Sequence, residues 1–595
     1  MKNLIHCLYI ALFVEVSFGQ ISFSGDAQLR YGESKNRFGY SETLVNTNLQ
    51  FGNFFNWIQF EFSDPPEIGR SFSGLRNIRL DYQKGPVRLG IGDIYEIWGR
   101  GLVLNQVDDQ AVDLNNKLTG LTFVYQTDRF RGQFLGGKTD IWKMKGFDTR
   151  VPSYKVHYNV FGSDAEVYIK NVTLGISFLQ SRENHPITFN QIFMPDTLEL
   201  VHRLHGVRFE YFSTFFDIYS EYADKNTLHK YNVGIDQLDS LVNRGQGFYG
   251  NINLYPGAWS FSIDYKKYNY INLAPDARWD FVDNYGGVLD FQQPPIGIRE
   301  HSTRLLSRII HQVDFNNEVG YQIEAVGSVT DWFTLLIHYA RSSRTNIWEQ
   351  PEEYQWTKKS YKGFLPHSDP AANPFEELYI EEEGYNFSDR LHHRVGIGYT
   401  KDIPDLSKNI VTDSTKNIRY ELIEAISIPT SFEYVFSNGW SFEIKAEYQK
   451  LKRGFWVYEE KNSVISVDSL ESSFYKEDSV GQRKYYSFQY NSFFSFGIGK
   501  SPNWSISLII DGISIEEPSN IGIKNVTNPL EDFLSNIINI DNKWISIEFV
   551  YNITPTHRLS LMYGSQQGGL LCSNGICRTI EPFDDGFKLT LTSIF

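Results

Sequence analysis

The chain has 595 residues, of which 16% are aromatic, and a formal net charge of −15 at pH 7. Nucleic-acid binding depends on clustered Lys and Arg, so this acidic balance argues against a nucleic acid as partner. No run of about 18 apolar residues occurs, which excludes a transmembrane helix. The mean hydropathy is −0.35, yet there are 45 Phe and 36 Tyr. This combination is typical of a membrane β-barrel, whose outer face is apolar and whose lumen is polar.

The first residues predict an export signal. Lys2 precedes a short apolar run at 8–14, and Ser17 and Gly19 offer small residues before a cleavage in front of Gln20. A run of this length is a signal peptide rather than a membrane span. The chain therefore divides into a signal peptide, residues 1–19, and a barrel, residues 20–595. The alternative is the first strand or helix of a cytosolic protein.

Alternation of apolar and polar residues begins at the predicted cleavage site and recurs along the chain. It is clear over 21–31, 259–265, 440–448 and 545–551, and it predicts strands. A tilted strand crosses a membrane in roughly 9–11 residues, which is about the length of these segments. A β-sandwich or propeller would alternate as well. Aromatic residues at the segment ends and the lack of a blade-length repeat favour the barrel.

Short turns alternate with long polar connections, as in barrels with periplasmic turns and extracellular loops. Asn438-Gly439 is one tight turn, and 83–86 and 127–129 are others. Counting segments predicts an all-β, antiparallel transmembrane barrel of roughly 24–26 strands with long extracellular loops. In a barrel this wide, some long segments are expected to fold inward. The predicted long connections are 100–119, 180–203, 223–245, 267–317, 341–391, 401–427, 452–482 and 512–542.

The last segment, 587–595, alternates and stops at Phe595. A final strand that ends in Phe resembles the signal read by the barrel-assembly machinery, so we expect that machinery as a partner during biogenesis. Pairing of this strand with 20–31 would remove both free sheet edges, as a hydrocarbon environment demands. No plug domain of over a hundred residues precedes Ile21, so TonB-dependent uptake is not the expected activity.

Cys572 and Cys577 are the two cysteines left after cleavage, and they flank Asn574-Gly575. A close pair in an exported protein predicts a disulfide, here in a surface connection. The alternative is a redox or metal site, but no His or further Cys accompanies the pair.

The densest polar cluster follows a Gly-rich segment, 90–104. It superficially resembles a phosphate-binding loop, but the Lys-Ser/Thr of a P-loop is missing and no dinucleotide-type helix follows. Glycines among strand residues indicate bulges or close backbone approach. The cluster either forms an ion-paired lumenal constriction or simply holds the segment against the wall; the second interpretation is favoured. Its candidate residues are Asp93, Tyr95, Trp98, Arg100, Asp108, Asp109 and Asp113.

Other charged motifs give no catalytic or metal site. Glu376-Glu377 and 381–383 read as a solvated loop, since EF-hand spacing is absent. His392-His393 has no further ligand nearby. Neither a G-x-S-x-G nor an H-E-x-x-H motif occurs. We therefore predict that the protein is not an enzyme, with no cofactor and no metal.

Several stretches resemble an uncharacterised outer-membrane barrel family of Bacteroidetes-type bacteria, recorded as a domain of unknown function. They are 92–102 with 109–116, then Pro294-Pro295 with 299–301, and finally 563–593 with its two cysteines. The resemblance extends from near position 90 to the C-terminus. It implies an integral outer-membrane protein and assigns no activity or catalytic residue.

The predicted location is the outer membrane of a Gram-negative cell, with membrane lipid as a partner. The first functional hypothesis is a channel or passive transporter for polar solutes, motivated by the polar lumen and the long loops. The second is a surface scaffold or adhesion barrel with a plugged lumen, which assembles with a secretion or surface-lipoprotein partner. The sequence identifies neither a solute nor a surface protein partner.

Overall fold

The computed structural model describes residues 21–35, 39–143, 151–152, 154–186, 197–233, 236–270, 287–352, 355–360, 363–404, 419–457, 476–477, 483–516 and 542–595. The predicted signal peptide, residues 1–19, lies outside the described residues. Within the described ranges, no helix combines the length and apolarity needed to cross a membrane.

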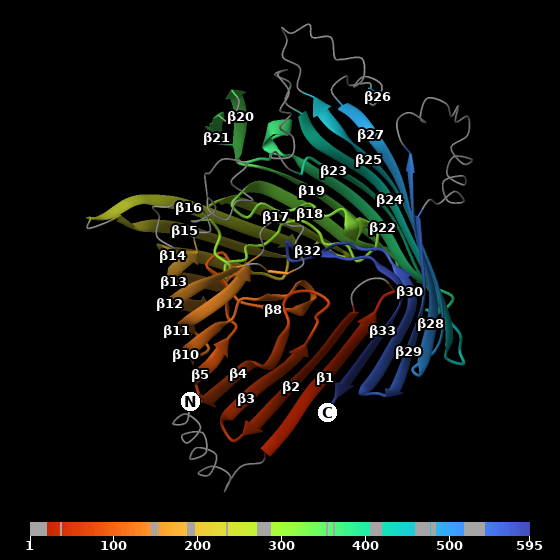
Figure 1. Ribbon diagram of the computed structural model, residues 1–595, viewed down its shortest axis with the longest axis horizontal. Coiled ribbons are helices and arrows are strands. Elements are labelled where there is room, and N and C mark those ends of the chain that lie inside the picture. The colour runs from red at the N-terminus through yellow and green to blue at the C-terminus, as the bar shows by residue number, and fades with distance from the viewer. Residues whose placement is uncertain are drawn as a thin grey trace.

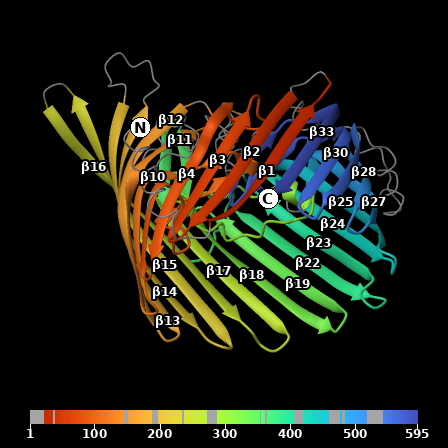
Figure 2. The same ribbon diagram turned by 90° about the horizontal axis from the view of Figure 1, so that it is seen from below.

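Twenty-four long antiparallel strands, counted over the described part of the chain, form one closed sheet (Figures 1 and 2). This confirms the predicted barrel and its strand number. In chain order the wall strands are β1 Ile21–Glu33, β2 Gly39–Phe51, β3 Phe54–Ser63, β4 Phe72–Lys84, β5 Val87–Ile94, β10 Leu118–Gln126, β11 Phe130–Lys143, β12 Tyr154–Ile169, β13 Val172–Pro186, β14 Thr197–Phe212, β15 Phe216–Val233, β16 Asp236–Leu254, β17 Trp259–Asn269, β18 Asn317–Thr330, β19 Phe333–Ser343, β22 Phe375–Asn386, β23 Leu391–Asp402, β24 Arg419–Val435, β25 Trp440–Val457, β27 Arg483–Lys500, β28 Trp504–Glu516, β29 Asn542–Thr554, β30 His557–Gln566 and β33 Phe583–Ile594.

Short elements lie between the wall strands. They are β6 Ile97–Trp98, β7 Leu104–Asn105, β8 Asp108–Asp109, the 3₁₀ turn η1 Gln110–Val112, β9 Leu114–Asn115, η3 Leu306–Arg308, β20 Asn346–Glu352, β21 Gln355–Ser360, η4 Pro370–Ala372, β26 Lys476–Glu477, β31 Gly569–Ser573 and β32 Ile576–Ile580.

The first and last wall strands close the barrel. β1 pairs antiparallel with β33 from Asp26 opposite Ile594 to Glu33 opposite Phe587. The backbone N–H of Gly25 donates to the carbonyl of Phe595 at 2.8 Å, and the return bond is 2.9 Å. The predicted seam between the two ends of the alternating pattern is therefore confirmed, and the sheet has no free edge between them.

The two faces of the wall have reversed polarity compared with a soluble protein. Outward side chains are apolar and exposed, for example Leu121 (61%), Phe134 (61%) and Ile176 (63%). Inward side chains include buried polar groups such as Asp164 (2%) and Gln449 (0%). A continuous exposed apolar face requires an apolar surrounding, and large closed antiparallel barrels of this kind span the bacterial outer membrane. The protein is therefore an integral outer-membrane β-barrel.

Two of the predicted long loops are in large part strand, and a third, 341–391, contains the wall strand β22. β15 continues to Val233 and β16 begins at Asp236, so the predicted loop 223–245 was wrong. Likewise, β13 runs to Pro186 and β14 begins at Thr197, within the predicted connection 180–203. The polar residues on the outer face here are compatible with strands that continue beyond the membrane, where backbone pairing persists in water. Much of the predicted connections 401–427, 452–482 and 512–542 lies outside the described residues.

The alternation predicts opposite effects for neighbouring positions on β28. Leu508 faces outward and is 37% exposed, whereas Ser507 faces inward and pairs in register with Glu548. Leu508→Arg should destabilise the barrel by roughly 2–4 kcal/mol, because it places a charge in hydrocarbon. Ser507→Arg should change stability little, since the new cation meets acidic lumenal side chains. Urea unfolding in lipid vesicles measures both, and equal destabilisation would contradict the assigned faces.

Candidate functional site

Three segments leave the barrel wall and fold into the lumen (Figure 1). We call residues 95–117, 287–316 and 567–582 the first, second and third plug segments; they connect β5 to β10, β17 to β18, and β30 to β33. The tight turns 85–86 and 127–129 lie at the opposite rim from the first of these connections. Because short turns face the periplasm in outer-membrane barrels, the plug segments enter from the extracellular rim.

The first plug segment is anchored by Trp98. This side chain is 0% exposed, and its indole Nε1 donates to Gln133 Oε1 of β11 at 3.1 Å. Gly162 of β12 makes room for it, because a Cβ there would lie 2.7 Å from the indole ring. Gly99 follows with φ of 58°, and a Cβ at this position would lie 2.6 Å from the Glu221 carboxylate. Both glycines allow a close approach, and Gly99 belongs to the Gly-rich segment 90–104 for which the sequence predicted one.

Trp98 belongs to an apolar cluster inside the lumen. Wall residues such as Leu135, Val156 and Leu179 point inward and are 5% exposed or less. Lumenal positions in water-filled barrels are polar, so these side chains indicate a packed core between the plug and β10–β16. The buried members of this cluster are Ile94, Trp98, Leu102, Val103, Leu104, Leu118, Leu135, Ile141, Val156, Tyr158, Val160, Leu179, Leu204, Tyr219, Ala223, Tyr249, Leu289 and Phe291.

Asp93 and Tyr95 tie the start of the first plug segment to its own end. Asp93 is 3% exposed, and its carboxylate accepts a hydrogen bond from Lys117 Nζ at 3.0 Å. The Tyr95 hydroxyl lies 3.1 Å from Oδ1 of both Asn77 and Asn115. Each carboxylate and amide is satisfied within this network, as buried polar groups require. The two residues thus stabilise the segment rather than project into open lumen.

The charged residues of the first plug segment contact the wall. The backbone N–H of Arg100 donates to the Glu221 carboxylate at 2.7 Å, and its guanidinium lies over the Tyr219 ring at 5.1 Å. Asp108 accepts from Arg76 of β4 at 2.8 Å. These contacts join the first plug segment to the wall. Arg100 and Asp108 thus contact different wall strands, β15 and β4.

Asp109 and Asp113 flank η1. Asp109 caps this turn, since its carboxylate accepts from the Ala111 backbone N–H at 3.0 Å. Asp113 faces the third plug segment. Burial raises the pKa of its carboxyl to about 6, against the opposing effect of the Arg76 and Arg578 guanidinium groups. The charge of the Asp113 carboxyl therefore changes near pH 6.

The second plug segment reaches both sides of the wall. On one side, Asp290 accepts from the Tyr158 hydroxyl at 2.7 Å and pairs with Lys143 at 3.0 Å. On the other side, Arg308 Nη1 donates to Asp511 of β28 at 3.0 Å. The segment thus crosses the lumen between β11–β12 and β28. The sequence expectation that long segments fold inward is met here by residues of the predicted connection 267–317.

Histidines join the second plug segment to β18–β23. His311 lies 3.1 Å from Asp402 and 3.4 Å from Glu318. Burial disfavours the charged imidazole, but the two carboxylates outweigh it and raise the pKa of His311 to about 9. The ring therefore stays protonated at neutral pH and bridges two wall acids.

The acidic stretch predicted as a solvated loop is instead part of β22. Glu377 is 5% exposed and Glu381 is 7% exposed. Glu377 Oε1 lies 2.9 Å from Nε2 of His301 and 3.4 Å from Nε2 of His338. The charge run was misread because alternate members face the lumen, where a plug histidine compensates Glu377. Over the described ranges, no group of three or more His, Cys, Asp or Glu is arranged to hold a metal ion.

The third plug segment is a hairpin of β31 and β32, and the predicted Cys572–Cys577 disulfide joins its strands. The hairpin packs on both other plug segments. Gln293 Nε2 donates to the carbonyl of Asn574 at 3.0 Å, and Arg578 Nε donates to the carbonyl of Val112 at 2.9 Å. The prediction of a surface connection was therefore wrong: this hairpin folds inward and links the plug segments to each other.

A charged belt consists of inward side chains of β4–β14 together with Glu96 of the first plug segment, and the sequence reasoning missed it. At its centre, Arg208 donates to Asp164 at 2.7 Å and to Glu166 at 2.7 Å. Arg79 and Asp81, and likewise Asp164 and Glu166, stand two residues apart on their strands. Alternation therefore placed them on the inner face without showing which residues pair. The members are Arg79, Asp81, Arg88, Glu96, Arg131, Asp164, Glu166 and Arg208.

Removing the Trp98 anchor should loosen the plug. Trp98→Ala leaves a cavity in a fully buried site, which costs about 3–5 kcal/mol in protein cores. Trp332→Ala is the matched control, because Trp332 is 50% exposed on a turn. Limited proteolysis of the folded barrel should cut residues 95–117 in the first variant only. Unchanged protection in Trp98→Ala would show that the indole is not the anchor.

Asp113 should make stability depend on pH. Its carboxyl has an ordinary pKa of 3.8 and a folded value of about 6, so the folded chain holds more protons between these values. The free energy of unfolding therefore falls by roughly 1–3 kcal/mol as the pH rises from about 4 to 6, since one pKa unit corresponds to about 1.4 kcal/mol. Above this window the contribution of Asp113 no longer changes with pH. The difference in unfolding midpoint between wild type and Asp113→Asn should change across this window. A pH-independent difference would refute the assignment.

Comparison with known proteins places the sequence in a family without assigning an activity. No curated protein matches it. Solved structures with a similar chain trace include the siderophore receptor PirA from Pseudomonas aeruginosa (7% identity, TM-score 0.42, covering 96% of this chain and 80% of that one). The copper transporter OprC has 9% identity and a TM-score of 0.43, covering 97% and 80%. The unliganded ferric citrate transporter FecA has 10% and 0.40, covering 96% and 79%.

Identities of 7–10% and TM-scores of 0.40–0.43 carry no information on activity. The family model that matches is the family of unknown function DUF6029, over residues 9–361 and 520–595. The match includes all three plug segments. Because it spans well over half of the sequence, the chain belongs to the DUF6029 family.

Proposed function

We propose that the protein is a gated outer-membrane transporter for a polar solute, and that the plug segments are its gate. The observation that carries the proposal is the asymmetry of plug attachment. Towards β10–β16 the plug is held by the apolar cluster around Trp98 and Phe291, both 0% exposed. Towards β25 and β28 the second plug segment makes hydrogen bonds and ion pairs from Arg304, Leu305 and Arg308 to Glu447 and Asp511. A plug fixed on one side and held by ion pairs on the other can open along the second side.

The polar side of the gate centres on η3. Glu447 of β25 accepts from the backbone N–H groups of Arg304 and Leu305 at 3.0 and 2.8 Å. Asp511 of β28 pairs with Arg304 and Arg308. Such contacts can be exchanged for water at modest net cost, whereas apolar burial cannot. This supports movement of η3 away from β25–β28 while the first plug segment stays in place.

The wall supports a polar solute. The charged belt carries both signs, and Arg79, Arg88 and Arg131 retain 13%, 36% and 18% side-chain exposure. A lining of paired charges with accessible edges suits a hydrophilic solute better than an apolar one. The proposal thus keeps the predicted channel or passive transporter for a polar solute and adds a gate to it.

Asp511 offers the direct test. Asp511→Asn removes the charge that pairs with both arginines, so the gate should open more often. In planar bilayers, the wild-type barrel should show little conductance and Asp511→Asn a several-fold higher open probability. Glu548→Gln is the matched control, because Glu548 accepts from Ser560 of the neighbouring strand and its described contacts do not involve the plug. The control should behave as wild type.

A scaffold with a permanently plugged lumen is the second candidate, favoured by the contacts of the plug with both sides of the wall. It predicts no conductance in Asp511→Asn or in a variant that lacks residues 569–580. It also predicts that purification in mild detergent recovers a stoichiometric surface or secretion partner. Conductance that rises in both variants, with no such partner, would exclude the scaffold.

A further inference from the structure

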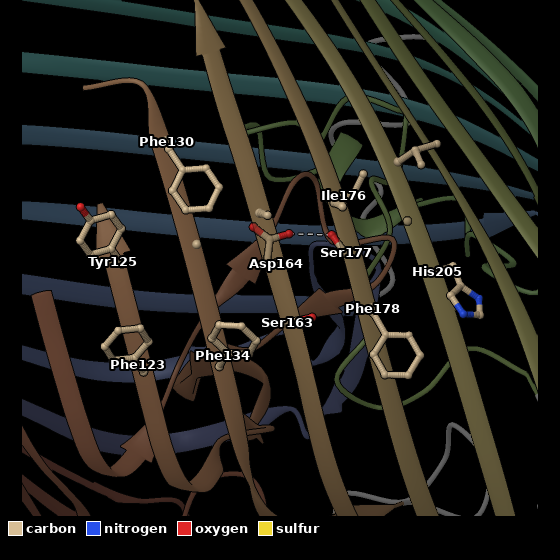
Figure 3. A pocket seen from close by; sticks show the side chains of 14 residues that line it. Phe123, Tyr125, Phe130, Phe134, Ser163, Asp164, Ile176, Ser177, Phe178 and His205 are labelled. Atoms are coloured by element: carbon tan, nitrogen blue, oxygen red, sulfur yellow. Dashed lines mark hydrogen bonds between the residues drawn. The ribbon is translucent and has the colours of Figure 1, made fainter. Parts of the chain in front are cut away.

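A groove of about 450 Å³ lies in the outer face of the barrel, across β10–β14. Figure 3 shows aromatic rings on β10 and β11 on one side, Phe178 and His205 on the other, and the strand of Ser163 between them. The groove opens on the apolar face that contacts membrane lipid. Its lining residues are Phe123, Tyr125, Phe130, Gly132, Phe134, Ser163, Asp164, Ala165, Ile176, Ser177, Phe178, His205, Gly206 and Val207.

Small outward residues form the floor of the groove. Gly132 of β11 lies opposite Ala165 of β12, and the next outward position of β12 is Ser163. On the far side, Phe178 and Val207 stand on β13 and β14. Alternation dictates that these residues share the outer face. A stretch without large side chains between bulky neighbours leaves a furrow that runs along the strands.

On the inner side of the same wall, the polar side chains beneath the groove are hydrogen-bonded to one another. Asp164 is 2% exposed and accepts from Ser177 Oγ at 2.6 Å and from Arg208 Nη1 at 2.8 Å (Figure 3 for Ser177). The polar groups beneath the floor are therefore satisfied from the lumen. The groove offers its occupant mainly apolar surface, with the Tyr125 hydroxyl and the His205 imidazole at its margin.

Three basic residues stand just beyond the groove on the same face, towards the extracellular rim. Arg203 of β14 is one outward position beyond His205 and lies opposite Gln180. Arg182 of β13 and Lys138 of β11 lie in the next row of outward-facing residues beyond Arg203, on either side of Asn159 of β12. Two residues along a strand span about 6.6–6.8 Å. All three side chains are exposed, and none forms one of the ion pairs found among the described residues.

We propose that the groove binds one acyl chain of an anionic membrane lipid whose phosphate headgroup contacts Arg203, Arg182 and Lys138. An unfilled furrow would forfeit dispersion contacts along its walls, whereas a single hydrocarbon chain restores them. The unpaired cations lie on the rim side, at the depth where a chain in the groove would carry its headgroup, and they supply charge complementarity. The site lies on the outer surface, so it does not depend on the proposed transport activity.

The test is native mass spectrometry of the full-length barrel in nonionic detergent. Phosphatidylglycerol and phosphatidylcholine with identical acyl chains are the probes. The wild type should retain one phosphatidylglycerol and prefer it over phosphatidylcholine at least tenfold. The double variant Ser163→Phe, Ala165→Phe fills the groove and should lower binding of both lipids at least tenfold. Ala325→Phe is the matched control, because Ala325 faces outward on β18 away from the groove; it should bind as wild type.

The triple variant Lys138→Gln, Arg182→Gln, Arg203→Gln separates chain binding from headgroup binding. It should keep phosphatidylcholine binding and lose the preference for phosphatidylglycerol. Heat-modifiable mobility in gels confirms that each variant is a folded barrel. Wild-type lipid retention in the filled-groove variant would overturn the site, and so would an unchanged preference in the triple variant. A stoichiometric dimer in place of bound lipid would assign the groove to a second copy of the chain.

Discussion

Closure of the sheet through β1 and β33 is the constraint on which the rest of the structure depends. In hydrocarbon every backbone N–H and C=O must be paired within the protein. The seam satisfies this need over eight register pairs, from Asp26 opposite Ile594 to Glu33 opposite Phe587. Once the ring is closed, each strand has one face in lipid and one in the lumen. The alternation of the sequence then decides the chemistry of both spaces.

A wide ring creates a second requirement, since its lumen must be either wet or filled. This chain does both. The half of the wall formed by β10–β16 carries inward Leu, Val and Tyr side chains that pack on the plug, whereas the charged belt and Asp511 of β28 present charged groups to the lumen. The plug consequently has an apolar attachment and a polar one. The proposed gate follows from this difference rather than from any single residue.

The fold was largely predictable, because period-two alternation and the terminal Phe595 are local signals that survive folding. The strand at 259–265, the turn at Asn438-Gly439 and the seam were all read from them. The partners of the candidate residues were not predictable. Arg100 contacts Tyr219 and Glu221, over a hundred residues away, and no sequence spacing encodes such a contact.

Two misreadings have the same physical origin. The acidic run in β22 and the Cys572–Cys577 hairpin were both assigned to solvent, the first because of its charge and the second because it connects two strands at the extracellular rim. In this barrel the polar interior is the lumen and the plug, so a hydrophilic segment has two destinations. The choice between them is made by tertiary partners such as His301 for Glu377 and Gln293 for the hairpin.

All three plug segments are attached to the wall at the same, extracellular rim, and this limits how they can move. Each segment leaves the wall and returns to it at the extracellular side, as a loop with two fixed ends. Outward swinging needs only rotation about these attachment points and no threading of chain through the pore. Because the disulfide-closed hairpin contacts both other loops, movement of the second plug segment in the proposed gate must either break its contact with the hairpin or carry the hairpin along. The plug therefore consists of three loops that are joined to the wall at both ends and to one another through the hairpin.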